Sequence, residues 1–311
     1  VADDLHDALG RLEGRGMQRL VLDLRDNGGG IVSQAAKVAG EFLPEGATIY
    51  TSAGRKKEVV DTGRVKRSFW RSERRYPIVV LVNQGTASAS ELVAGALQDH
   101  DRALIMGRPT FGKALLMQGL PLSDGSVMML VVGQVRTPCG RVVQRAYRAL
   151  TTRNYYRLAG EARDTVGRPS CKTDRGRVVY GGGGVVPDVM LAPPSDLPPW
   201  LSRINEADVW LEWLGSYLST DGARLTTLEA FVGDETRSTT AIAAFRALAM
   251  RHDIDIPSDA DEVLWRAMRQ VVAGAKWGDG GALTVRARLD PQVRTAMDGF
   301  SRAAALLGPE R

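Results

Sequence analysis

The sequence is poor in residues that bind metals, and it contains no long apolar run. Of its 311 residues, three are histidines and two are cysteines. His6, His100 and His252 do not follow a metal-ligand spacing, so a catalytic metal would lack recognisable ligands and no cofactor is expected. No stretch of about 18 consecutive apolar residues occurs, which excludes an ordinary membrane-spanning helix.

The low cysteine count excludes a disulfide framework as well as a zinc site. Cys139 and Cys171 either form one bridge in an oxidising compartment or are two small buried apolar side chains. The sequence leaves both alternatives open.

Charge of one sign is not in large excess. The 41 Lys and Arg residues face 36 Asp and Glu, and the resulting net charge of +5 is scattered along the chain. Nucleic-acid binding proteins usually have a clustered basic face, whereas the densest basic stretch here, residues 64–75, is typical of a solvated loop. We therefore expect no nucleic-acid partner. With 44% apolar and 25% charged residues, the composition is that of a soluble globular protein.

Apolar periodicity in the first half of the chain alternates between helix and strand. The spacing predicts helices over 3–16, 33–42 and 88–98, and buried strands over 19–24, 78–83 and 103–106. Further strands are expected over 126–134 and 142–144. Short, nearly continuous apolar strands between helices are typical of an α/β fold whose sheet is covered on both faces.

The composition changes near residue 193. Four prolines, Pro193, Pro194, Pro198 and Pro199, interrupt the chain, and the patterns beyond them are helical, with one stripe through Leu211, Leu214, Tyr217 and Leu218 and another over 241–250. We therefore predict a core domain over 1–192, containing an insertion over about 142–180, and a mostly helical region over 193–311.

Ser88 lies where the strand over 78–83 passes into the next helix. Small residues surround it, so another backbone or a substrate can approach closely. The amide of Ala89 would be an unpaired donor of the first helical turn, which suits an acyl-transfer nucleophile. Ser88 and Glu91 also match a capping box, and most such serines are only caps. Ser90 is an alternative nucleophile.

A serine nucleophile needs a base, and no histidine is suitably placed. A lysine amine can serve when it is neutral, and removal from water favours that form. Lys113 lies among apolar residues that could desolvate it. The ordinary alternative is a lysine that extends from a strand edge into water.

Seven segments occur together in one order, and this combination is specific. They are 22–30, 85–99, 102–103, 110–113, 121–125, 137–141 and 182–188, with sequences that include LDLRDNGGG, GTASASE, TFGK and GGGVVPD. In this order they resemble the carboxyl-terminal processing, or tail-specific, proteases. The resemblance covers about residues 5–191.

The resemblance implies a serine endopeptidase with a Clp protease/crotonase-like core of stacked sheets and helices. Its nucleophile falls on Ser88, and its lysine base falls on Lys113, 25 residues later. The oxyanion-hole amides fall on Ala89 and Gly29. Asp99, three helical turns beyond the serine, is too distant to touch it and is interpreted as structural.

The resemblance also implies protein or peptide substrates with flexible C-termini and a periplasmic or other extracytoplasmic location in bacteria. A PDZ domain is expected upstream in the full-length chain, because no such segment precedes the core in these 311 residues. A homo-oligomer is a further possibility.

One position departs from the family pattern. Many members have a lysine-orienting glutamine where this chain has Met117, and the neighbouring Gln118 should point to the opposite face of the strand. Two hypotheses follow. The lysine is held less firmly, so that Met117→Gln would raise turnover, or the insertion supplies a substitute such as Asn154 or one of its tyrosines, Tyr147, Tyr155 and Tyr156. The first is our expectation from the sequence.

Two other functions remain as alternatives. A catalytically weak or silent peptide- or ligand-binding module on the same fold is the stronger alternative, because of Met117. An acyl-CoA enzyme of the crotonase type lacks an evident carboxylate pair in its glycine-rich turns.

Overall fold

The computed structural model describes residues 1–308 except 55, 57, 67–73, 148–150, 152, 156–164, 194–197 and 235. Two compact units are present. Unit 1 comprises Val1–Pro193 and Thr295–Arg311, and unit 2 comprises Pro194–Arg294. Each has its own apolar core. The region over 193–311 is mostly helical, and its last segment belongs to unit 1, where helix α11 (Phe300–Leu307) contacts two strands.

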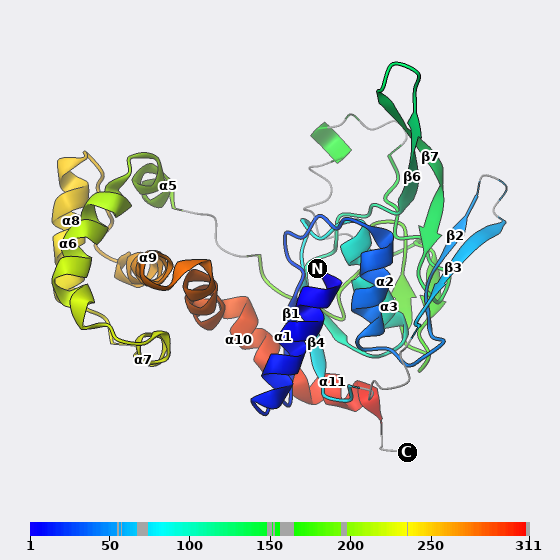
Figure 1. Ribbon diagram of the computed structural model, residues 1–311, viewed down its shortest axis with the longest axis horizontal. Helices are drawn as coiled ribbons and strands as arrows, with labels where there is room; N and C mark the ends of the chain where they lie inside the picture. The colour runs from blue at the N-terminus through cyan, green and yellow to red at the C-terminus, as the bar shows by residue number, and fades with distance from the viewer. Residues whose placement is uncertain are drawn as a thin grey trace. The chain divides into compact units, whose positions relative to one another are not determined.

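Unit 1 is built around a four-stranded parallel sheet (Figure 1). In spatial order its strands are β1 (Leu20–Asp23), β4 (Ile78–Val82), β5 (Leu104–Gly107) and β10 (Val189–Met190). Val80 of β4 lies between Leu22 of β1 and Ile105 of β5. All five residues of β4 are apolar and buried, as a covered parallel sheet requires. The predicted α/β class with a helical C-terminal region is confirmed.

Helices cover this sheet and position the candidate nucleophile. They are α1 (Ala2–Gly14), α2 (Val32–Gly40), α3 (Ala89–Asp99) and α11. Every residue of α3 is buried, and the helix contacts α2 and β5. Because α3 follows β4 after a short turn, its N-terminus lies at the carboxyl end of the central strand, where open α/β sheets commonly place their sites.

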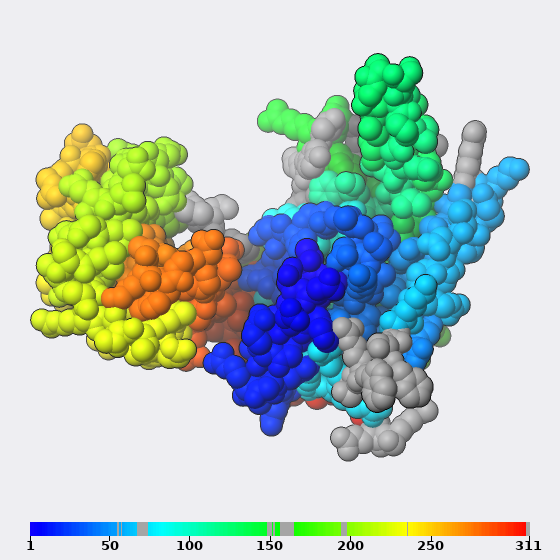
Figure 2. Space-filling model, viewed as in Figure 1, coloured from blue at the N-terminus to red at the C-terminus, as the bar shows by residue number. Residues whose placement is uncertain are grey.

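A second, antiparallel sheet carries the segment that follows Lys113. Its order is β3 (Val59–Arg64), β2 (Thr48–Ala53), β7 (Val127–Arg136) and β6 (Leu115–Pro121). Strand β2 pairs only with the last three residues of β7, 134–136. The rest of the β6–β7 hairpin therefore projects as an arm (Figures 1 and 2), with apolar side chains such as Val127 and Met129 exposed.

The expected insertion is attached to the core by loop contacts and one covalent link. The predicted strand over 142–144 is wrong, because the carbonyl groups of Val142 and Val143 accept hydrogen bonds from glycine amides of a loop and not from a strand ladder. Further along, β8 (Ser170–Lys172) and β9 (Val178–Tyr180) form a small hairpin. A disulfide joins Cys139 to Cys171, which decides between the two alternatives left open by the sequence.

Unit 2 is helical. Its elements are α5 (Pro199–Glu206), α6 (Val209–Ser219), the 3-10 helix η1 (Asp221–Arg224), α7 (Leu228–Gly233), α8 (Thr239–Arg251) and α9 (Asp261–Leu289), followed by α10 (Pro291–Asp298) at the boundary with unit 1. Trp213 and Phe245 pack at 5.5 Å between ring centroids in its core. The predicted stripe is partly wrong, since Leu211 is 69% exposed. Among the described residues, no helix has the length and apolarity needed to cross a bilayer.

Candidate active site

Ser88 occupies the turn between β4 and α3 in an uncommon backbone conformation. Its φ of 57° and ψ of −118° lie outside the regions that non-glycine residues usually adopt. Such strain persists where surrounding contacts fix it, and it is enriched at functional sites. Here the Ser88 N–H donates to the Glu91 carboxylate at 2.9 Å. The serine is therefore held in place by its backbone.

The Ser90 hydroxyl is already hydrogen-bonded to another side chain. The Ser90 side chain is buried, and its hydroxyl donates to the Asn27 side-chain oxygen at 2.9 Å. Asn27 belongs to the glycine-rich turn after β1, and its backbone carbonyl accepts the N–H of Ala87. Ser90 therefore ties this turn to α3, which favours Ser88 over Ser90 as the nucleophile.

The glycine-rich turn lies directly against the candidate nucleophile. A Cβ built on Gly29 would be 2.6 Å from the Ala89 nitrogen and 2.5 Å from the Ala87 oxygen, so no larger residue fits without backbone movement. Gly29 also has φ of +85°, which favours glycine. The glycine-rich turn thus lies against the two peptide groups that flank Ser88, although the two segments are about sixty residues apart in sequence.

The expected oxyanion-hole amides differ in availability. Ala89 begins α3, and its N–H makes no hydrogen bond within the described part of the chain. The Gly29 N–H, in contrast, donates to the Asn27 side-chain oxygen at 3.0 Å. Gly30 is adjacent, and its N–H has no partner among the described residues. Among the described residues, the amides of Ala89, which follows Ser88, and of Gly30, which follows Gly29, thus have no hydrogen-bond partner.

Lys113 lies on the wall of a pocket of about 640 Å³. The pocket is lined by Gln84, Gly85, Ala87, Phe111, Lys113, Leu115, Met117, Gln144, Tyr147 and Tyr155. Lys113, Leu115 and Met117 alternate along one face, while Gln118 is not part of the lining, as the strand pattern predicted.

The surroundings of Lys113 differ from expectation in one respect. Its apolar neighbours in sequence do not bury it, and the residue is exposed. The reason is its place two residues before the edge strand β6, in a segment whose alternate side chains face the open pocket. Its amine has no hydrogen-bond or ion-pair partner in the described ranges. The expected desolvation is therefore absent from the structure as it stands.

A buried carboxylate connects the two candidate catalytic segments. Glu91 is fully buried, and its carboxylate accepts the Thr110 hydroxyl at 2.5 Å, the Gly112 N–H at 2.7 Å, the Lys113 N–H at 2.8 Å and the Ser88 N–H at 2.9 Å. Burial raises the pKa of Glu91 above its ordinary value, although these hydrogen bonds oppose the rise. The local sequence around Glu91 indicates only half of a capping box, because its second set of partners comes from residues 110–113.

Asp99 performs the structural role expected of it. Its side chain is fully buried at the end of α3 and pairs with the equally buried Arg141 guanidinium at 2.7 Å. The Cys139 N–H donates to the same carboxylate at 3.1 Å. A buried pair of this kind holds neighbouring segments together.

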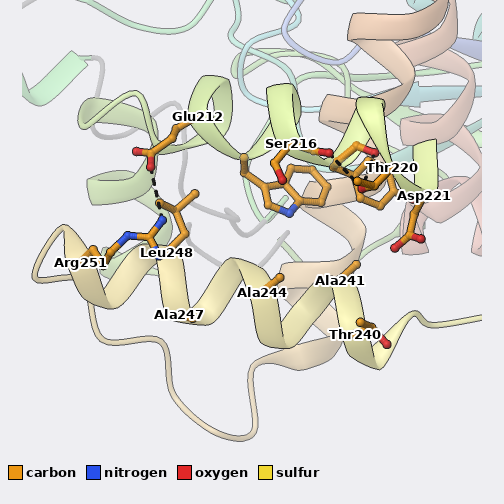
Figure 3. A pocket seen from close by; sticks show the side chains of 12 residues that line it. Glu212, Ser216, Thr220, Asp221, Thr240, Ala241, Ala244, Ala247, Leu248 and Arg251 are labelled. Carbon is orange, nitrogen blue, oxygen red and sulfur yellow. Dashed lines mark hydrogen bonds and ion pairs between the residues drawn. The ribbon is translucent and has the colours of Figure 1, made fainter. Parts of the chain in front are cut away.

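A second pocket, of about 580 Å³, lies between α6 and α8 of unit 2 (Figure 3). Small side chains such as Ala244 and Ser216 line it, and Glu212 and Arg251 pair across one end at 3.4 Å. The hydrogen bond from His252 lowers the pKa of the Glu212 carboxyl. Glu212 and Arg251 offset each other's charge, and we assign this pocket no catalytic role.

Among the described residues, no cluster of three or more histidine, cysteine, aspartate or glutamate side chains could hold a metal ion. The candidate site consists of a hydroxyl, an amine and free backbone amides. This set of groups is typical of acyl transfer at a serine.

Comparison with known proteins places these residues in a family. Residues 1–148 match the family described as Peptidase family S41. They form a peptidase S41 domain. The domain includes Ser88 and Lys113, and the resemblance found in the sequence is confirmed.

The relatives of this S41 domain are carboxyl-terminal processing proteases. The protease of Synechocystis sp. is 42% identical over 133 residues, which is 42% of this chain and 30% of that protein. The chloroplastic peptidase 2 of Arabidopsis thaliana is 40% identical over 135 residues, covering 43% of this chain and 25% of that protein. That of Bartonella bacilliformis is 44% identical over 124 residues, covering 40% and 28%.

Among solved structures, the photosystem II D1 C-terminal processing protease is similar, with 31% identity and a TM-score of 0.46 over 65% of this chain and 42% of that protein. The curated relatives are matched over only about a quarter to a third of their own length.

Proposed function

We propose that this chain is a serine endopeptidase of the C-terminal processing type, with Ser88 as nucleophile and Lys113 as general base. The single observation that carries the proposal is the Glu91 carboxylate, which accepts the backbone N–H groups of both Ser88 and Lys113. One buried group thereby holds the peptide groups of hydroxyl and amine next to each other. The relatives' printed names support peptide hydrolysis as the chemistry.

In the proposed mechanism, the neutral Lys113 amine takes the proton of the Ser88 hydroxyl as its oxygen attacks the scissile carbonyl carbon. The oxyanion of the tetrahedral intermediate is bound by the amides of Ala89 and Gly30, with Gly30 taking the place first expected of Gly29. The lysine then gives its proton to the leaving amine, and water hydrolyses the acyl-enzyme by the same steps in reverse order.

The exposure of Lys113 assigns a role to the substrate. In the open pocket the amine is in contact with water. A polypeptide lying against Leu115 and Met117 would displace that water from the amine. Catalytic desolvation would then accompany binding, so residues that improve substrate contact should raise turnover as well as affinity.

The proposed substrates are proteins with flexible C-termini, by likeness to the relatives. An open pocket lined by both apolar and polar side chains suits an unfolded segment. The Cys139–Cys171 disulfide supports an extracytoplasmic location, such as the periplasm of a bacterium, because such bonds persist in oxidising compartments. An upstream PDZ domain and a homo-oligomer stay predictions.

A binding module without catalysis is the second candidate, favoured by Met117 and by the Lys113 amine, which has no partner among the residues that the structure describes. Cleavage of fluorescently labelled β-casein, an unfolded protein, separates the two. The endopeptidase proposal expects turnover by the wild type, at least a hundredfold loss in Ser88→Ala, and most of the activity in Ser90→Ala. Equal cleavage by wild type and Ser88→Ala would refute it.

A further inference from the structure

The peptide groups around Lys113 are hydrogen-bonded from two opposite sides. On one side, Glu91 accepts the N–H groups of Gly112 and Lys113. On the other side, hydrogen bonds come from the segment after residue 141. The first of them is donated by the Arg145 N–H to the Gly112 carbonyl at 2.9 Å. The backbone from which the lysine extends is therefore fixed on both sides.

Gln144 holds the residue after Lys113. Its side-chain oxygen accepts the Ala114 N–H at 2.8 Å. Its side-chain nitrogen donates to the Arg145 carbonyl at 2.9 Å and to the Tyr155 hydroxyl at 3.3 Å. Both ends of the carboxamide are thus engaged, which fixes its orientation.

Tyr155 holds the residue before Lys113. Its hydroxyl donates to the Gly112 carbonyl at 3.4 Å while accepting from Gln144. Its ring packs edge-on against Phe111, with ring centroids 5.4 Å apart and planes at 76°. Edge-to-face packing restrains the ring, so the hydroxyl has a defined position.

Gln144 and Tyr155 are bonded to each other, and together they hold the two peptide neighbours of Lys113. They also line the same pocket as the lysine. Met117, on the same wall, offers a thioether where the family pattern has a hydrogen-bonding amide, and a thioether is only a weak acceptor.

We propose that Gln144 and Tyr155 are the positioning residues of Lys113 and replace the glutamine missing at position 117. This inference rests on the proposed function, in which Lys113 is the base. A long side chain amplifies any rotation of its backbone, so control of the flanking peptide groups controls where the amine can reach. The expectation from the sequence alone, a loosely held lysine, is replaced by one held through its backbone.

Turnover of labelled β-casein gives the first test. Tyr155→Phe keeps the ring that packs on Phe111 and removes only the hydroxyl, and we expect kcat to fall about three- to tenfold. Tyr180→Phe removes a tyrosine hydroxyl at the end of the same segment, outside the pocket, and should leave kcat unchanged.

Rescue separates positioning from general damage to the fold. Met117→Gln should change wild-type turnover little but restore most of the activity of Tyr155→Phe, since it supplies the orienting amide by another route. An unchanged Tyr155→Phe, or a loss that Met117→Gln does not relieve, would overturn the inference. A large gain from Met117→Gln in the wild type would overturn it too, because the lysine would then be poorly held despite Tyr155.

A second measurement does not depend on proteolysis. Trinitrobenzenesulfonate reacts with neutral amines, and peptide mass spectrometry can report its rate at Lys113 alone. The inference predicts that Tyr155→Phe changes this rate at least twofold, that Met117→Gln reverses the change, and that Tyr180→Phe leaves it unaltered. An inactive wild type with this labelling pattern would refute the proposed function and sustain the inference, while identical labelling in all variants would refute the inference itself.

Discussion

Glu91 offers the sharpest test of how the site is assembled. Replacement by alanine would leave three backbone N–H groups, those of Ser88, Gly112 and Lys113, without their acceptor inside the protein. Each buried unsatisfied donor costs about 1–3 kcal/mol. The sum, roughly 3–9 kcal/mol, is comparable with the whole stability of a typical domain. We expect Glu91→Ala to be largely unfolded at 37 °C.

Glutamine at the same position should be much milder. Its amide nitrogen can face the Thr110 hydroxyl, which is able to accept, while its oxygen keeps the N–H groups of Ser88 and Lys113. The Gly112 N–H and the Thr110 O–H, which both donate to the same Glu91 oxygen, then lose their acceptor, at a cost of about 1–3 kcal/mol each. Because the contacts to Ser88 and Lys113 survive, Glu91→Gln should retain measurable turnover.

Urea denaturation followed by circular dichroism, together with casein cleavage at 20 °C, would check both variants. The expected order of stability is wild type, Glu91→Gln, Glu91→Ala, with activity in the same order. A Glu91→Ala protein as stable as the wild type would show that water or relaxation replaces the carboxylate, and that the three N–H groups do not need this acceptor. A glutamine variant less stable than the alanine variant would also contradict the expected order.

Three further predictions follow from the same site. Burial raises the pKa of Glu91, so the folded protein holds this proton more tightly than the unfolded chain. The stability that Glu91 contributes therefore falls as pH rises above about 4.5. In urea titrations, the difference in unfolding free energy between wild type and Glu91→Gln should narrow between pH 5 and pH 8, and a widening difference would contradict this sign. Lys113→Arg should be as inactive on casein as Lys113→Ala, because arginine does not lose its proton in proteins, whereas activity in the arginine variant would mean that charge alone suffices. Gly29→Ala should reduce turnover at least tenfold, since its Cβ would meet backbone atoms at 2.5–2.6 Å from a left-handed φ; wild-type kcat in that variant would show that the turn can move away from Ala89 without consequence.

Much of the core follows from local sequence patterns. The apolar run of β4 and the small residues after it predict a buried strand that passes into a helix, and both are present. Ser88 as nucleophile needed more, because a capping serine has the same local pattern. The ordered set of family segments favoured it over Ser90, and the hydrogen bond from Ser90 to Asn27 supports that preference.

Other features depend on contacts that no local pattern encodes. The exposure of Lys113 follows from the pairing of β6 at a sheet edge, and apolar neighbours in sequence could not reveal that. The occupied amide of Gly29 depends on the side-chain orientation of Asn27. The return of the last segment to unit 1 depends on contacts of α11 with β4 and β5, which lie far from it in sequence.

The bond between Cys139 and Cys171 has a consequence for the unfolded chain. It closes a loop of 32 residues that contains both Gln144 and Tyr155, and closing a loop of this length removes chain entropy worth about 3–4 kcal/mol at 25 °C. Of the described residues inside the loop, Val143 is the one apolar side chain that is fully buried. This wall of the pocket therefore owes much of its persistence to the entropy that the crosslink removes from the denatured ensemble, whereas β4 and α3 depend on their own packed core.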